Sequence, residues 1–204
     1  MLKTGGIVLA AGLSSRMGDF KPLLKIGNKV LIEATIDTLL EAGINEIVVV
    51  LGYRGSEIQA YLSKHTYARQ ITFAYNENYA TTDMLESIRI GIRKLGECDA
   101  FFILPGDMPA VKSETFQLLE CKMQASYEQA LVVFPTVSRS RKHPPLVSIK
   151  CRQLILEYEG INGLRGFWSQ IEDRSIYVDI NDHGCALDAD TRQDYDKLVK
   201  YMRL

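Results

Sequence analysis

The chain has 204 residues, an apolar share of 47% and a formal net charge of −1. A near-neutral chain with scattered basic residues argues against nucleic acid or an acidic membrane surface as a partner. No apolar run reaches the length of about 20 residues needed to span a bilayer, and no leader-like segment precedes the first apolar run, so we expect a cytoplasmic protein. The length and apolar share predict one domain over residues 1–204 with a substantial core.

The four cysteines and three histidines are dispersed along the chain. No CxxC pair occurs, which argues against a structural zinc site and fits a reducing compartment.

Strand-like and helix-like segments alternate along most of the chain. In chain order, the pattern predicts strand 5–10, helix 29–42, strand 46–51, helix 56–63, strand 70–75, helix 84–95, strand 99–104, helix 113–125 and strand 130–135. A polar loop at 138–145, a strand at 146–150, a helix from 152, a helix at 164–171, an extended segment at 175–178 and a helix at 190–201 follow. This alternation predicts an α/β fold with a parallel sheet covered by helices on both faces.

The loop after the first strand is rich in small residues and carries two cations, Arg16 and Lys21. Small residues let backbone N–H groups approach an anion, and cations share its charge, so this pattern is typical of a phosphate-binding loop. It matches neither GxGxxG nor a Walker loop, which argues against an NAD-dependent oxidoreductase.

A carboxylate follows the fourth predicted strand. Asp107 is preceded by Gly106 and flanked by Pro105 and Pro109. Asp beside Gly is often a turn cap, but a carboxylate held stiffly at the carboxyl end of a strand also suits a magnesium ligand.

A second pair of acids occurs near the end of the chain. Asp188 and Asp190 alternate, and we expect them to share one face of an extended segment. Either could supply a second metal ligand, and capping of the following helix is the alternative.

The start of the 84–95 helix carries Asp83 and Ser87. Spacing favours Asp83 as a plain N-cap, while Ser87 could read the edge of a nucleobase.

Two further segments suggest an anionic second substrate. Basic residues surround His143 between positions 139 and 143, and Arg165 stands between two glycines. A solvated loop explains the first segment equally well.

At these residues the chain resembles the MobA-like nucleotidyltransferase family, on its molybdenum cofactor cytidylyltransferase-like branch. The residues that carry the resemblance are Leu9-Ala10-Ala11-Gly12, Arg16-Met17-Gly18, Lys21, Ser87, Gly91, Gly106-Asp107, Pro109, His143-Pro144-Pro145-Leu146, Gly163, Arg165, Asp188, Asp190, Thr191 and Asp194. The chain departs from the usual family pattern at Asp83, Asn162 and Arg192-Gln193, which leaves the acceptor open.

The resemblance implies a Rossmann-like, three-layer α/β/α fold with a mixed, mainly parallel sheet. It implies catalytic roles for Arg16, Lys21 and Asp107, and Mg²⁺ held by Asp107 and Asp190. The nucleotide would contact Leu9, Ala10, Ala11, Gly12, Ser14, Ser15, Met17, Gly18, Asp83 and Ser87. The acceptor would contact His143, Pro145 and Arg165.

The activity that this resemblance implies is transfer of a nucleoside monophosphate, with CTP as the favoured donor, to a phosphate-bearing acceptor such as molybdopterin. Pyrophosphate is released, and a molybdoenzyme or its chaperone is a possible recipient of the product. The alternatives are a phospho-sugar or phospho-alcohol acceptor, or a non-catalytic nucleotide-binding module on the same fold.

Overall fold

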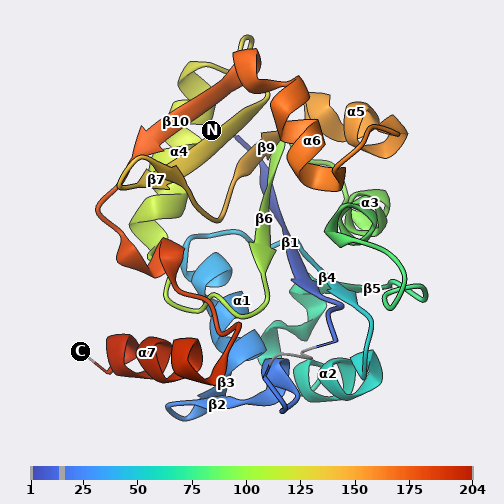
Figure 1. The fold of residues 1–204 in the computed structure, drawn as a ribbon, viewed down its shortest axis with the longest axis vertical. Helices are drawn as coiled ribbons and strands as arrows, with labels where there is room; N and C mark the ends of the chain where they lie inside the picture. Colours follow the sequence, from blue (N-terminus) through green and yellow to red (C-terminus); the bar gives the residue numbers. More distant parts are fainter. Residues whose placement is uncertain (1, 14–16, 204) are drawn as a thin grey trace.

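The computed structural model describes residues 2–13 and 17–203, which form an α/β/α arrangement around one twisted sheet (Figure 1). The strands of this eight-stranded sheet, among the described residues, are β1 (Thr4–Ala10), β4 (Ile47–Leu51), β5 (Ile71–Tyr75), β6 (Ala100–Pro105), β7 (Val132–Val137), β8 (Ser140–Arg141), β9 (Leu146–Ser148) and β10 (Ser175–Asp179). Their order is β10-β7-β9-β6-β1-β4-β5, and β8 pairs with β7.

The sheet is mixed and mainly parallel. Strand β1 lies in parallel between β4 and β6, β5 continues this arrangement beside β4, and β10 runs parallel to β7. Strand β9 runs antiparallel to both β6 and β7, and β8 is antiparallel to β7. The expected fold class is therefore confirmed, and the polar loop predicted at 138–145 also contains the short strand β8.

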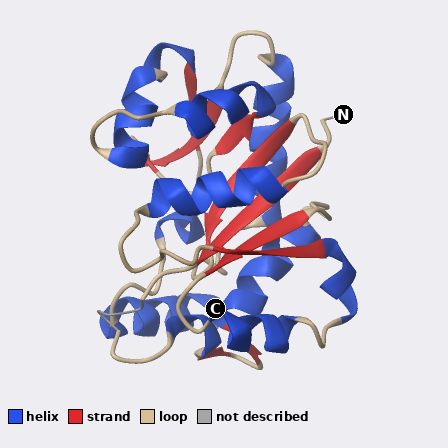
Figure 2. Cartoon of the chain, turned by 90° about the vertical axis from the view of Figure 1, so that its right-hand side faces the viewer, coloured by secondary structure: helices blue, strands red, loops and turns tan. Residues whose placement is uncertain are grey.

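Helices cover both faces of the sheet (Figure 2). The helices are α1 (Leu31–Glu41), α2 (Gly55–Leu62), α3 (Met84–Lys94), α4 (Ser113–Ala125), α5 (Arg152–Glu157), α6 (Gly163–Gln170) and α7 (Arg192–Met202). Short 3₁₀ turns occupy Lys21–Leu23, Thr66–Gln70, Ile149–Cys151, Glu172–Arg174 and His183–Ala186.

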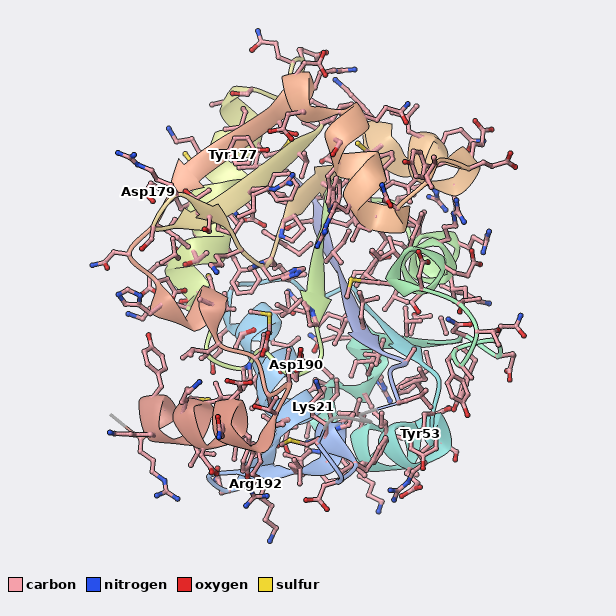
Figure 3. The ribbon with its side chains drawn as sticks, in the orientation of Figure 1. Lys21, Tyr53, Tyr177, Asp179, Asp190 and Arg192 are labelled. Atoms are coloured by element: carbon pink, nitrogen blue, oxygen red, sulfur yellow. The ribbon has the colours of Figure 1, made fainter. Side chains whose placement is uncertain are left out.

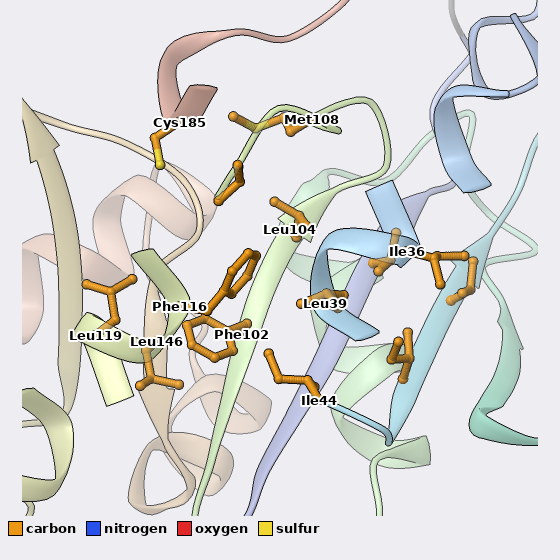
Figure 4. Close-up of a cluster of buried hydrophobic side chains, with 14 of the residues drawn as sticks. Ile36, Leu39, Ile44, Phe102, Leu104, Met108, Phe116, Leu119, Leu146 and Cys185 are labelled. Atoms are coloured by element: carbon orange, nitrogen blue, oxygen red, sulfur yellow. The ribbon is translucent and has the colours of Figure 1, made fainter. Parts of the chain in front are cut away.

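Side-chain alternation along the strands divides the core into two layers. Val8 and Phe102 point to the layer that α1, α2 and α4 cover, whereas Ile7 and Phe101 point to the layer under α3, α5 and α6. Figure 4 shows the first layer, where Phe102 and Phe116 lie between α1 and α4. The buried strands are apolar on both faces, which is why their sequences read as continuous apolar runs.

One predicted helix begins later than expected. Residues Lys29–Val30 form β3, which pairs with β2 (Lys25–Ile26) as a hairpin, and α1 starts only at Leu31. The apolar periodicity of 29–42 includes Val30 because that side chain is buried, although its backbone is extended.

A third, smaller apolar cluster joins this hairpin to α7. Ile26, Ala34, Ala189 and Leu198 are buried together there. The cluster brings the end of the chain, together with residues 187–191, against the beginning of α1.

The predicted cap of α3 by Asp83 is confirmed, whereas α7 is capped by Thr191 and not by Asp188 or Asp190. Asp83 accepts a hydrogen bond from the backbone N of Glu86, and Thr191 accepts one from the backbone N of Asp194, both at 3.2 Å. Helix α4 begins after Lys112, whose side chain makes no cap hydrogen bond. No helix in the described part of the chain is long and apolar enough to cross a bilayer.

Candidate functional site

A cavity of about 450 Å³ opens where β1 and β6 end, at the carboxyl edge of the parallel strands. Ligands of open α/β sheets bind at this edge. Its lining residues are Leu9, Ala10, Ala11, Gly12, Leu13, Lys21, Pro22, Tyr79, Thr82, Asp83, Met84, Ser87, Pro105, Gly106, Asp107, Met108, His143, Asp188 and Asp190.

An ammonium group lies between two carboxylates in this cavity. Lys21 Nζ is 2.7 Å from Asp107 Oδ2 and 3.1 Å from Asp190 Oδ1. The three residues come from the turn after the first loop, the end of β6 and the segment before α7, and Figure 3 shows Lys21 and Asp190 side by side. Burial alone would lower the pKa of Lys21, but Asp107 and Asp190 together raise it, so the lysine stays charged.

The Asp107 carboxylate is fixed from several sides. Its side chain is almost fully buried, and Oδ2 also accepts a hydrogen bond from the backbone N of Ala189 at 3.2 Å. The preceding Gly106 packs so closely that a Cβ there would lie 2.8 Å from Ile32 Cδ1 and 3.1 Å from the carbonyl oxygen of Leu9. Glycine therefore allows the Asp107 turn to sit directly on β1.

A third carboxyl, Asp188, lines the same cavity. Burial, together with the charges of Asp107 and Asp190, raises its pKa. Asp188 and Asp190 line the same cavity, but residues 187–190 do not form a strand, because the buried Ala189 donates to Asp107 and not to a neighbouring strand.

These oxygen donors fit a magnesium ion that also binds a ligand. Among the described residues, no three His, Cys, Asp or Glu side chains are gathered as a complete metal site. Mg²⁺ is commonly held by one or two carboxylates together with substrate phosphates and water. Asp107 and Asp190, already bridged by one cation, match that arrangement.

The opposite wall of the cavity is the start of α3. Asp83 and Ser87 both line it, and the contact of Ser87 with a nucleobase stays a prediction. Gly163, with a φ of 52°, lies against this wall, because a Cβ there would clash with Asp83 Oδ2. The start of α6 therefore abuts the start of α3.

His143 also reaches the cavity. Its Nδ1 is buried without a hydrogen-bond partner among the described residues. Burial lowers its pKa, against the opposing effects of the Ile103 backbone and Asp107, so its imidazole is neutral near pH 7. A neutral ring carries one donor and one acceptor nitrogen, of which Nδ1 is the one without a partner among the described residues.

The predicted nucleotide-binding loop continues beyond Gly12 to positions 14–18. Ser14, Ser15 and Arg16 lie outside the described residues, so their expected contacts remain predictions. Met17 is buried and Gly18 is exposed, and neither lines the cavity.

Two of the predicted acceptor contacts lie away from the cavity lining. Pro145 is buried in the sheet, where its carbonyl accepts from the backbone N of Ile103. Arg165 is exposed on α6. Of the three acceptor residues, the structure brings only His143 into the cavity.

Sequence reasoning missed Tyr79 and Asn76. Tyr79 lines the cavity, and Asn76 supports its α3 wall from beneath. A polar residue directly after a strand looks like an ordinary turn, so Asn76 gave no distinguishing signal.

The model of the MobA-like NTP transferase domain matches residues 6–175 of this chain. The chain belongs to the MobA-like NTP transferase family. The chain is 28% identical to the molybdenum cofactor cytidylyltransferase of Escherichia coli K12 over 191 residues. The aligned region covers 93% of this chain and 92% of that protein.

Solved structures share the fold of this family member. A nucleotidyl transferase from Methanothermobacter has a TM-score of 0.78 and 23% identity, with 98% of both chains covered. Rv0371c from Mycobacterium tuberculosis H37Rv, in complex with manganese, has a TM-score of 0.67 and 20% identity, covering 97% of this chain and 98% of that one. The recognised family and the expected nucleotidyltransferase fold are thus confirmed.

Proposed function

We propose that this protein transfers CMP from CTP to a phosphate-bearing small molecule, with molybdopterin as the favoured acceptor, and releases pyrophosphate. The observation that carries the proposal is Lys21 held between Asp107 and Asp190 at the carboxyl edge of the sheet. The similarity to a cytidylyltransferase over nearly the whole of both chains supports the choice of nucleotide and acceptor.

In the proposed reaction, a phosphate oxygen of the acceptor attacks the α-phosphorus of CTP. The bond from the α-phosphorus to the bridging oxygen breaks, and that oxygen leaves with pyrophosphate. An ionised phosphate needs no general base, so the demands on the protein are alignment and charge neutralisation.

The predicted nucleotide-binding loop and the charged groups of the cavity have separate roles in this reaction. The loop from Leu9 to Gly18, including Arg16, binds the triphosphate, and Lys21 shares its negative charge. Lys21 is already charged and held by two carboxylates, so little reorganisation is needed when the triphosphate binds.

Asp107 and Asp190 would hold Mg²⁺, whose chemistry is to neutralise the triphosphate oxygens. A fold relative in complex with manganese supports a divalent ion here. The neutral His143, whose buried Nδ1 has no partner among the described residues, supports an acceptor contact in the cavity. The exposed Arg165 would reach the acceptor only from the rim.

The test is pyrophosphate release from CTP, Mg²⁺ and molybdopterin. We expect Lys21→Ala and Asp107→Ala each to lower kcat by about a hundredfold or more, since removal of one preorganised charge contact costs about 2.7–4 kcal/mol of barrier. A matched control is Lys64→Ala, an exposed lysine beyond α2 that lines no part of this cavity. Wild-type turnover in either cavity variant, at saturating CTP, Mg²⁺ and acceptor, would contradict the proposal.

The same assay separates the alternatives. Release with a phospho-sugar or phospho-alcohol, and none with molybdopterin, would reassign the acceptor. Calorimetric heat with CTP and Mg²⁺, but no release with any acceptor, would indicate a non-catalytic binding module.

A further inference from the structure

Asn76 lies beneath the α3 wall of the cavity and is only 2% exposed. It follows β5 directly, and its backbone N donates to the carbonyl oxygen of Leu51 at 2.8 Å, which anchors it to β4. The position of the Asn76 backbone is therefore fixed relative to the sheet.

The carboxamide of Asn76 can adopt only one orientation. Its Oδ1 accepts from the backbone N of Asn78 at 3.1 Å, while Nδ2 donates to Thr82 Oγ1 at 2.9 Å and to Ser87 Oγ at 3.1 Å. Exchange of the amide oxygen and nitrogen would set an N–H group against the N–H of Asn78. The backbone donor thus decides which end of the amide faces the two hydroxyls.

This orientation fixes the polarity of the Ser87 hydroxyl. Because Ser87 Oγ accepts from Asn76, its hydrogen is left to donate, and no described residue accepts it. The Thr82 hydroxyl differs, because it already donates to the carbonyl oxygen of Asn78 at 2.9 Å. Both residues line the cavity, but of their two hydroxyls only that of Ser87 has a hydrogen to offer a ligand.

We propose that Asn76 is a positioning residue that fixes the Ser87 hydroxyl as a hydrogen-bond donor to an acceptor atom on the nucleobase. This inference rests on the proposed use of CTP and on the expectation that Ser87 reads the edge of its base. Cytosine presents such acceptors at its O2 and N3 atoms. Asn76 itself touches no ligand and acts through Ser87.

The experiment is calorimetric titration with CTP in the presence of Mg²⁺. The variants are Ser87→Ala, Asn76→Ala, Asn76→Asp and the two double variants. We expect Ser87→Ala to weaken CTP binding by about tenfold, in the range of one hydrogen bond. Asn76→Asp should weaken it at least as much, because a carboxylate only accepts and would turn the Ser87 hydrogen away from the base.

The double variants test whether Asn76 acts through Ser87. In the Ser87→Ala background, we expect either change at Asn76 to weaken CTP binding by less than about twofold, because the hydroxyl through which Asn76 acts is gone. If the single effects multiply in full, Asn76 does not act through Ser87 and the inference is wrong. At saturating CTP, the Asn76 variants should keep the wild-type kcat for pyrophosphate release while KM rises.

A stability control excludes a merely structural role. Leu62→Ala empties a fully buried site on α2, outside this cavity, and should lower Tm without changing CTP affinity. If Leu62→Ala weakens CTP binding as much as Asn76→Asp does, the Asn76 effect reflects stability alone and the inference falls. Failure of the wild-type protein to bind CTP would overturn the proposed function as well, whereas multiplicative effects with intact wild-type binding overturn only the role of Asn76.

Discussion

The side-chain oxygen of Thr35, in the middle of α1, lies 3.2 Å from the carbonyl oxygen of Gly106, the residue before Asp107. The same hydroxyl is 2.9 Å from the carbonyl oxygen of Leu31, one turn earlier in α1, so its hydrogen is shared between the two. A buried helix thereby holds the turn that carries the central carboxylate of the cavity.

We expect loosening of this turn to lower activity through position alone. Gly106→Ala places a methyl group against Ile32 and the backbone of Leu9, and should reduce kcat by about a hundredfold, which is the scale of a 1 Å misplacement in an active site. Thr35→Val removes the hydroxyl and should reduce kcat by about tenfold, the scale of one hydrogen bond. Steady-state pyrophosphate release measures both.

Thr38→Val is the control for this pair. In the wild type, the Thr38 hydroxyl donates to the carbonyl oxygen of Thr35 at 2.8 Å and does not contact the Asp107 turn. Turnover like that of the wild type in Gly106→Ala would show that the turn tolerates displacement, contrary to this account.

Much of this arrangement follows from the sequence, because the strands are buried on both faces. Continuous apolar runs such as Ile47–Leu51 predict their position without reference to partners, and parallel strands bring Gly12 and Asp107 to one edge. The hairpin at Lys29–Val30 was not predictable, because its strand character depends on pairing with Lys25–Ile26.

Contacts across long sequence separations were equally hidden. The role of Asn76 depends on α3 folding back over β5, and the distance of Arg165 from the cavity lining depends on the packing of α6 against α3. Neither relationship leaves a local pattern in the chain.

The core between α1 and α4 should be sensitive to loss of volume. Phe102 packs edge-to-face on Phe116, with ring centroids 5.0 Å apart and an interplanar angle of 81°, and both rings are fully buried. Phe102→Ala should lower the free energy of unfolding by about 3–5 kcal/mol. Urea unfolding measures this, and a loss below about 1 kcal/mol would contradict the packing described.

Thermal stability should depend on pH through the ionisation of Glu120. Burial raises the pKa of Glu120, against the opposing hydrogen bond from Thr4. Its protonated form is thus favoured by folding, and the associated stability is lost as pH rises from about 4 through the raised pKa. Relative to the wild type, Glu120→Gln should therefore gain in Tm between pH 4 and pH 7.

For Glu57 we expect the opposite pH dependence of Tm. Arg54 lowers the pKa of Glu57, whose stabilising contribution is lost as pH falls. Glu57→Gln should accordingly lose Tm relative to the wild type, by a small amount because the pair is exposed, as pH rises from below the lowered pKa of Glu57 to about 5. Parallel Tm shifts in the two variants would contradict the assignment.

The cysteines should differ in reactivity under native conditions. Cys121 is exposed, whereas burial raises the pKa of Cys98 to about 11 and that of Cys151 to about 12, and also raises that of Cys185. Because the thiolate is the reactive form, a disulfide reagent at pH 8 should modify Cys121 rapidly and the others slowly. Rapid modification of Cys121→Ser would contradict this prediction, and denaturation should expose all the thiols.

The cavity takes its charged groups from three distant parts of the chain. Lys21 is made early, Asp107 near the midpoint and Asp190 close to the end, and Ala189 must be in place before Asp107 has all its partners. During synthesis, Lys21 therefore emerges from the ribosome long before Asp107 and Asp190, its two partners. The three charged groups can meet only after the chain has been made beyond Asp190 and the segment around Ala189 has docked.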